Sequence, residues 1–97
     1  MKPFYLVVDV KIDDAEAYGK YKKKVKPLIE SYGGEYLSRG GEMVVLENEL
    51  WEPTRMVLVK FPDKESAINW YNCEEYQALK KIRIDNATST SFFIEGL

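Results

Sequence analysis

The sequence contains no histidine. Without an imidazole there can be no His-ligated metal site, and neither a Ser-His nor a Cys-His nucleophile can be assembled. No cluster of Asp and Glu has the spacing of a metal-binding loop, and no glycine-rich phosphate loop or dinucleotide fingerprint is present. We therefore expect no metal and no cofactor. Any catalysis would have to use Asp, Glu, Tyr, Arg or Lys, or chemistry intrinsic to the substrate.

Cysteine is almost absent as well, because Cys73 is the only one. A single cysteine excludes an internal disulfide and fits a reducing compartment. No apolar run approaches the roughly 20 residues that span a bilayer. The first residues, Met1 to Pro3, lead directly into a strand pattern without the features of a signal peptide. These features predict a soluble, cytoplasmic protein with no membrane partner.

An excess of positive charge is also missing, since the formal net charge is −2. A mildly acidic chain lacks the field that holds phosphate backbones, so we expect no nucleic-acid partner. The one local excess, Lys20 to Lys26, is interpreted as the solvated face of a helix. With 97 residues the chain predicts one domain, residues 1–97, near the lower limit of what a single core stabilises. Additional surface buried by self-association would therefore matter for the stability of the protein.

Strand and helix patterns follow one another regularly along the chain. Short runs rich in β-branched and aromatic residues predict strands, and apolar residues at three- and four-residue steps predict helices. Helices are expected to begin at Asp13-Asp14 and Pro62-Asp63, where carboxylates can cap them. Gly33-Gly34 is expected to end the first helix, and Asn72-Cys73 to interrupt the second. The predicted strands are residues 4–12, 35–47, 55–61 and 87–95.

The pair Gly40-Gly41 lies within the second of these strand patterns. Two glycines here form either a tight turn or a bulge that bends one long strand. We favour the bulge, so that the strand continues to Glu47. Residues 48–54 then form a loop.

The predicted order of elements is βαββαβ. Right-handed crossovers turn this order into a four-stranded antiparallel sheet with both helices on one face, an α+β ferredoxin-like sandwich. RNA-recognition motifs share the order, but their third strand carries basic and aromatic residues on its exposed face. Residues 55–60 carry no such aromatic ring, so we reject RNA binding.

The strands are apolar on both faces, which is unusual for a sheet covered on one side only. In the first strand Leu6 and Val8 point to one face, yet Tyr5 and Val7 point to the other. The chain offers no second layer of helices to cover that other face. A second copy is the simplest cover, so we expect a homodimer packed sheet to sheet.

An ordered set of short motifs runs through nearly the whole chain. No member is specific alone, but together they resemble the proteins grouped as domain of unknown function 1330, within the dimeric α/β-barrel superfamily. The resemblance implies a ferredoxin-like protomer, a dimer whose sheets form a barrel, and a cleft between sheet and helices. It implies no established activity. The motifs are Asp14…Tyr18…Tyr21, Tyr32-Gly33-Gly34, Arg39-Gly40-Gly41, Glu47, Trp51-Glu52-Pro53, Arg55, Phe61-Pro62, Ala67, Trp70-Tyr71, Tyr76-Gln77, Arg83 and Glu95-Gly96.

Two departures from the family pattern stand out. Cys73 occupies the position where a serine usually leads the last helix, so a weaker thiol replaces the hydroxyl cap. The loop Asn48-Glu49-Leu50 is longer than usual, and Asn48 replaces a glycine. If that loop lines the cleft, ligand preference differs from that of relatives.

Two arginines are candidates for holding an anion. Arg83, on the apolar stripe of the last helix, either points under the sheet toward an anion or is a helix C-terminal cation paired with Glu75, Asp85 or a carbonyl. Arg39 either presents its fork to a carboxylate ligand or pairs with Glu47 across the sheet, and we favour the pairing.

Asp9 is the one acidic residue in an apolar strand. If it is buried, its pKa rises toward the range of a general base. The alternative, which we favour, is an edge-exposed carboxylate or a partner for Lys11 or Lys60.

The segment Trp70-Tyr71 and Tyr76 places three aromatic groups with polar tips close together. They could line a ligand pocket, with hydroxyls that orient the ligand, or simply pack in the core or at an interface. Cys73 beside them is interpreted as a structural thiol, because the neighbouring acids oppose a thiolate.

Two functions of different classes fit these residues. One is a cofactor-independent enzyme acting on a small organic acid or carbonyl compound. In this hypothesis Arg39 or Arg83 holds the anion, Asp9 or a tyrosine such as Tyr76 moves a proton, and Trp70 and Tyr71 help to bind the ligand. The alternative is a non-catalytic dimeric module that binds a small ligand or stabilises a partner.

Overall fold

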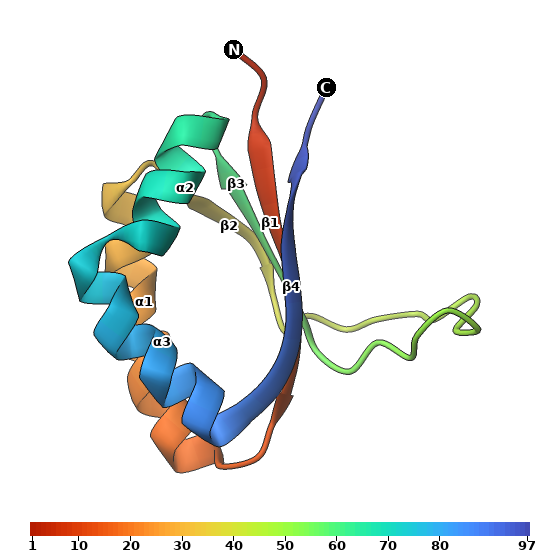
Figure 1. Cartoon of the computed structure of the whole chain (residues 1–97). Coiled ribbons are helices and arrows are strands. Elements are labelled where there is room, and N and C mark those ends of the chain that lie inside the picture. Colours follow the sequence, from red (N-terminus) through yellow and green to blue (C-terminus); the bar gives the residue numbers. More distant parts are fainter.

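The computed structural model describes all 97 residues and has the predicted architecture. Four strands form one antiparallel sheet in the order β2-β3-β1-β4. All helices cover the same face of this sheet, which we call the inner face (Figure 1). The α+β ferredoxin-like prediction is therefore confirmed. The elements are β1 (Phe4–Ile12), α1 (Ala15–Ser31), β2 (Glu35–Arg39), β3 (Met56–Phe61), α2 (Lys64–Asn72), α3 (Glu74–Asn86) and β4 (Ala87–Glu95).

The helix boundaries follow from the capping residues that the sequence supplies. Asp14 accepts a hydrogen bond from the backbone N–H of Ala17 at 3.1 Å and begins α1. Asp63 does the same for Ser66 at 2.8 Å and begins α2. Gly33, with φ +83°, takes the left-handed conformation that ends α1. The predicted helix starts and the predicted end are confirmed.

The predicted break in the second helical region is also confirmed. Cys73 has extended backbone angles, φ −67° and ψ 153°, and separates α2 from α3. It is the N-cap of α3, but its thiol makes no capping hydrogen bond.

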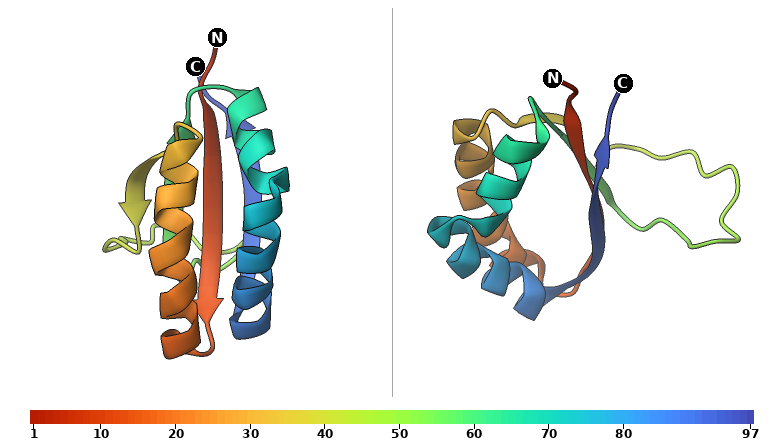
Figure 2. Two further views of the ribbon diagram at one scale, coloured as in Figure 1. Left: turned by 90° about the vertical axis from the view of Figure 1, so that its left-hand side faces the viewer. Right: turned by 45° about the horizontal axis from the view of Figure 1, so that its top comes forward.

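The helices form one layer over the inner face, in which α1 packs beside α3 (Figure 2). The core lies between these two layers, and its largest fully buried side chains are Trp70, Tyr76, Phe61, Val10 and Val59. None of the helices is long and apolar enough to cross a bilayer.

The prediction of one long strand over residues 35–47 is wrong. The strand β2 ends at Arg39, and Gly40, with φ +70°, turns the chain out of the sheet. Beyond it the chain pairs with no strand of the sheet, and residues 41–54 form an irregular excursion that we call the arm. It projects from the side of the sheet opposite the helices, the outer face (Figures 1 and 2).

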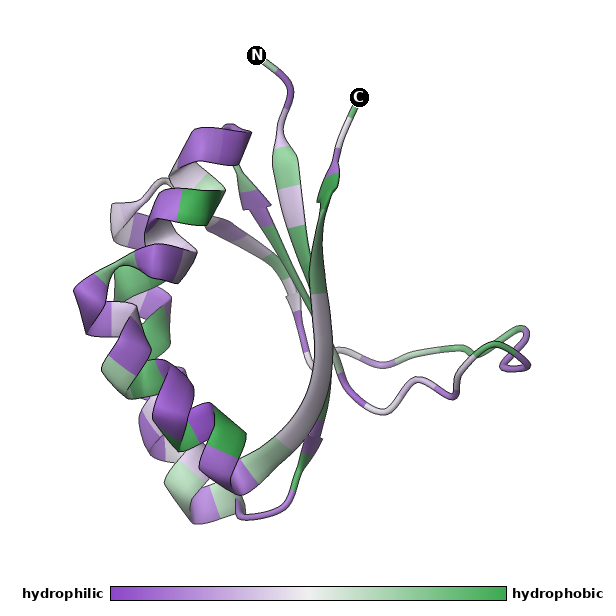
Figure 3. Cartoon of the chain, in the orientation of Figure 1, coloured by the Kyte–Doolittle hydropathy of each residue, from purple (hydrophilic) through white to green (hydrophobic).

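Both the outer face and the arm expose large apolar side chains. On β4, Phe92 and Ile94 are 42% and 54% exposed. Along the arm the hydrophobic stretches stand clear of the rest of the chain (Figure 3), and Val44, Leu46 and Leu50 are more than 80% exposed at 81%, 89% and 91%. A single chain therefore leaves an apolar surface of the kind that usually marks an interaction site.

Candidate functional site

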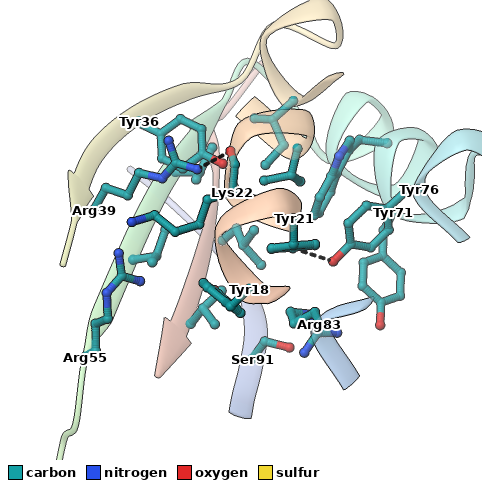
Figure 4. A pocket seen from close by; sticks show the side chains of 17 residues that line it. Tyr18, Tyr21, Lys22, Tyr36, Arg39, Arg55, Tyr71, Tyr76, Arg83 and Ser91 are labelled. Carbon is teal, nitrogen blue, oxygen red and sulfur yellow. Dashed lines mark hydrogen bonds between the residues drawn. The ribbon is translucent and has the colours of Figure 1, made fainter. Parts of the chain in front are cut away.

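A pocket lies between the inner face of the sheet and the helices (Figure 4). It encloses about 530 Å³ of empty space, its open mouth included. Much of its wall is aliphatic, from Leu6, Val57 and Val59 on the sheet and Val25 and Ile29 on α1. A mostly apolar pocket with a few convergent polar groups is the usual form of a small-molecule site.

Every arginine of the chain lines this pocket. Arg39 ends β2, Arg55 precedes β3, Arg83 belongs to α3, and Lys22 of α1 joins them. No carboxylate lines the pocket, and the three ion pairs of the structure all join lysines to acids on exposed side chains elsewhere. Positive charges in an apolar wall attract an anion when nothing in the protein compensates them.

Arg39 reaches the pocket because of an irregularity in β2. Between Tyr36 and Ser38 the pairing with β3 shifts, so that Tyr36 lies opposite Val59 and Arg39 opposite Val57. Strict alternation would have put Arg39 on the outer face, because successive side chains of a strand point to opposite sides. The bulge therefore brings Arg39 into the site.

The guanidinium of Arg39 is held without an acidic partner. It donates a hydrogen bond to the carbonyl oxygen of Lys22, and its Cζ lies 4.8 Å from the ring centroid of Tyr36. The predicted pairing with Glu47 is wrong, because Glu47 lies on the arm, is exposed and forms no ion pair.

Arg55 owes its place to a neighbouring glycine. A Cβ on Gly40 would lie 2.7 Å from Nε and 2.8 Å from Nη2 of Arg55. A side chain at this position would displace the guanidinium, and glycine adopts φ +70° at little cost. Two features of the structure therefore favour glycine at position 40: the turn in the backbone and the close approach of the Arg55 guanidinium.

Lys22 was not among the residues predicted for the site, because the lysine run was interpreted as a solvated helix face. A signal was available, because Lys22 follows Tyr18 by four residues and precedes Val25 by three, and therefore lies on the apolar stripe. Burial lowers the pKa of the Lys22 ammonium, and the positive charges of Arg55 and Arg39 lower it further. A larger fraction of neutral amine is thus present at any given pH than in a solvated lysine.

Arg83 is only 9% exposed and also lacks a carboxylate partner. Its Nη1 donates to the hydroxyl of Ser89 at 2.5 Å. The alternative of a pair with Asp85 is wrong, because Asp85 accepts from Lys81 at 3.2 Å. Burial alone would lower the pKa of Arg83, but nearby hydroxyls, first among them that of Tyr76, outweigh this effect and raise it, so the guanidinium stays charged.

Beside Arg83 lies a buried pair of hydroxyls. The oxygens of Tyr21 and Tyr76 are 3.0 Å apart and share one hydrogen bond. Burial raises the pKa of Tyr21 far above its usual range, with a further contribution from Tyr76. The Tyr21 hydroxyl is therefore neutral at physiological pH and available as a hydrogen-bond donor.

Trp70, Tyr71 and Tyr76 all line the pocket. Trp70 and Tyr76 also belong to the core, and their ring centroids are 4.3 Å apart, so packing and pocket wall are not exclusive roles. The indole nitrogen of Trp70 is buried without a hydrogen-bond partner. A role of the three side chains in ligand binding stays a prediction.

Asp9 lies outside the pocket, on the outer face. It accepts hydrogen bonds from Trp51 Nε1 at 2.8 Å and from the backbone N–H groups of Thr54 and Arg55 at 2.9 and 3.1 Å. Burial raises its pKa, but these three donors outweigh burial and lower it below the ordinary 3.8. The expected raised pKa is wrong, and so is the expected pairing with a lysine. Asp9 anchors the end of the arm to β1.

The two departures from the family pattern do not reach the pocket in the single chain. Cys73 is half-buried at the start of α3 and is not part of the pocket wall. The loop at Asn48 to Leu50 is exposed at the far end of the arm. The chain also contains no group of three or more Cys, Asp or Glu side chains placed to hold a metal ion.

The sequence profile described as "Domain of unknown function (DUF1330)" matches residues 3–97. The chain belongs to this family. The resemblance to DUF1330 that the motifs predicted is confirmed. The match covers nearly the whole chain. A comparison with curated proteins finds no match.

Several solved structures share the fold of this DUF1330 protein. A protein of unknown function from Rhodopseudomonas palustris has a TM-score of 0.78 at 18% identity, over 99% of this chain and 83% of its own. SnoaB, a cofactor-independent oxygenase from Streptomyces nogalater, has a TM-score of 0.69 at 8% identity, over 100% of this chain and 95% of its own. An ethyl tert-butyl ether d family protein from Bacillus halodurans has a TM-score of 0.59 at 15% identity, over the full length of both chains. At such identities these structures show a shared fold alone.

Proposed function

We propose that this protein is a cofactor-independent enzyme that acts on a small organic acid or carbonyl compound in the pocket between sheet and helices. The observation that carries the proposal is the set of four cations, with no carboxylate among them, in a mostly apolar wall. Guanidinium and ammonium groups in such a wall bind carboxylates and stabilise the negative charge of an enolate. The oxygenase SnoaB supports this reaction type by fold analogy only.

In this proposal Lys22 replaces Asp9 as the group that takes up a proton. Its lowered pKa gives it more of the neutral amine that a general base needs. With the substrate carboxylate held by Arg39 and Arg55, the amine removes a proton from the carbon next to the carbonyl group. The electron pair of that C–H bond moves onto the carbonyl oxygen.

The other side of the pocket is suited to stabilise that oxygen. Arg83 carries a full positive charge, and the hydroxyl pair of Tyr21 and Tyr76 can donate a hydrogen bond. Donors fixed in a site with little water stabilise developing negative charge strongly, because they need no reorganisation when it appears.

Hydrogen exchange tests the proposal without knowledge of the natural substrate. The protein is incubated with pyruvate, 2-oxobutyrate or phenylpyruvate in D₂O, and loss of the C–H signal is followed by proton NMR. We expect exchange above the buffer rate, slowed at least tenfold by Lys22→Met and unchanged by Lys23→Met. Lys23 is the matched control because it is the exposed neighbour on the same helix.

The non-catalytic alternative is favoured by one observation. The pocket wall has no carboxylate, cysteine or histidine that could act as a base, which leaves that role to Lys22 alone. A native mass spectrum of gently purified protein would reveal a retained small molecule. Acids that bind in the pocket, yet show no exchange above the buffer rate, would refute the enzyme and support a dimeric ligand-binding module.

We further propose that the protein is a homodimer whose copies pack through their outer faces. Val7, Leu58, Phe92 and Ile94 share that face, and the arm adds a second set of exposed apolar side chains on the same side. An apolar surface of this extent on a small chain needs a cover, and a two-fold interface supplies one for both copies.

A pair of isoleucines provides a controlled test of the dimer. Ile94 on β4 is 54% exposed on the outer face, and Ile84 on α3 is 56% exposed on the helical side. We expect Ile94→Lys to shift the mass in solution from dimer to monomer at micromolar concentration, and Ile84→Lys to leave the dimer intact. A monomeric wild-type protein would contradict the assembly.

A further inference from the structure

The cations of the pocket fall into two separate groups. Lys22, Arg39 and Arg55 lie together on one side of the pocket, and Arg83 lies on the other side with Tyr71 and Tyr76 (Figure 4). We call the first group the triple cluster and the second the Arg83 end. Tyr18 lies between them, since the charges of Arg55, Arg83 and Arg39 all act on its hydroxyl.

Neither group is neutralised by the protein. At the triple cluster, Arg39 has only the carbonyl oxygen of Lys22 and the face of Tyr36 as partners. At the Arg83 end, the guanidinium donates to one neutral hydroxyl, that of Ser89. A ligand with two charged groups can compensate both sites, because they lie on opposite sides of the pocket.

The space between the two groups favours a flat, apolar body. Val57 and Val59 of the sheet lie on one side of it, and Tyr18, Tyr21 and Trp70 of the helices add aromatic surface. Aromatic faces and edges pack well against planar conjugated groups.

From this arrangement we infer that the preferred ligand is a small diacid, with two carboxylates joined by an aromatic or conjugated body, bound with one carboxylate at the triple cluster and the other at the Arg83 end. The inference deepens the proposed function and rests on it for the use of this pocket. It concerns which acid is bound, so a binding measurement tests it independently of any reaction.

The experiment compares diacids with matching monoacids by isothermal titration calorimetry. The probes are benzene-1,4-dicarboxylate and naphthalene-2,6-dicarboxylate, against benzoate and naphthalene-2-carboxylate. A hydrogen bond to a charged group contributes enough for roughly ten- to hundredfold in affinity. We therefore expect at least one diacid to bind ten times more tightly than its monoacid at neutral pH. Equal affinities, or no binding of either class, would overturn the inference.

Variants at each end show whether both carboxylates are held as inferred. Arg83→Met and Arg55→Met should each remove most of the preference for the diacid while the monoacid still binds at the remaining end. Arg83→Lys keeps the positive charge, so we expect it to retain part of the preference for the diacid. This variant serves as the test at the Arg83 end if Arg83→Met does not fold. Lys23→Met, outside the pocket, should leave the preference unchanged.

The outcomes separate this inference from the proposed function. A preference for the diacid that survives Arg83→Met in a folded protein would refute the two-ended arrangement. Hydrogen exchange on carbonyl acids could still be observed in that case, and the enzyme proposal would stand. Conversely, a strong preference for the diacid without any exchange would leave the inference intact and refute the enzyme.

Discussion

Replacing Asp9 with asparagine should loosen the attachment of the arm to the sheet. The carboxylate accepts three hydrogen bonds, from Trp51 Nε1 and from the backbone N–H groups of Thr54 and Arg55. Hydrogen bonds to a charged group contribute about 1.5–3 kcal/mol each. Trp51 is 45% exposed, so water replaces part of its bond, and the asparagine keeps one acceptor oxygen. We therefore expect a loss of about 2–3 kcal/mol in the free energy of unfolding.

This loss is large enough to measure in a domain of this size. It corresponds to a melting temperature lower by roughly 10–20 °C, since 1 kcal/mol shifts the midpoint by about 4–8 °C in small domains. Urea denaturation at fixed protein concentration gives the free energy. The indole N–H resonance of Trp51 in a proton–nitrogen NMR spectrum reports the local detachment. Glu52→Gln is the matched control. It removes one negative charge, as Asp9→Asn does, but the side chain of Glu52 lies on the arm and makes no hydrogen bond.

The effect of Asp9 must depend on pH in one direction. The three donors bind the ionised carboxylate and hold its pKa below 3.8 in the folded protein. Its stabilising contribution is therefore complete well above pH 3.8 and is lost as the pH falls through that value toward the lower folded pKa. The difference between wild type and Asp9→Asn should shrink over the same range. A variant as stable as wild type at pH 7, or a difference that does not shrink in acid, would refute this reasoning.

Two further predictions concern the triple cluster. Gly40→Ala should cost about 1–2 kcal/mol of stability, because alanine at a positive φ is strained and its Cβ meets the guanidinium of Arg55. Calorimetry should also show weaker binding of benzene-1,4-dicarboxylate, and the control Gly41→Ala should have little effect. Because the pKa of Lys22 is lowered from 10.5, the wild-type protein should gain stability as the pH rises through the folded pKa toward 10.5, and Lys22→Met should not. Urea denaturation across that range checks this, with Lys23→Met as control; an equal gain in Lys22→Met would contradict the assignment.

Much of the fold follows from local patterns in the sequence. The first and last strands, the capped helix starts, the glycine that ends α1 and the break at Cys73 all match their predictions, because each depends on residues adjacent in the chain. The strand predicted over residues 35–47 failed for a non-local reason. A strand pattern becomes a strand only where it pairs with another strand, and beyond Gly40 the chain pairs with none.

The candidate site was predicted only in part. Trp70, Tyr71, Tyr76, Arg39 and Arg83 all line one pocket, and the binding and catalytic roles predicted for them stay predictions. The role assumed for Asp9 required a raised pKa, and its actual partners come from a loop more than 40 residues away in the chain. No local pattern contains that information.

The sequence determined the helices and all of the strands except the length of β2, which faces are apolar, and that no histidine chemistry is available. These properties depend on the 3.6- and 2-residue periods of the backbone and on composition. Only the tertiary structure decided where the charges lie. A one-residue bulge turns Arg39 inward, and the bare backbone of Gly40 makes room for Arg55. The position of Lys22 on the α1 stripe then brings a third cation to the same place. Such placements depend on register and on contacts between distant segments, which the order of residues alone does not display.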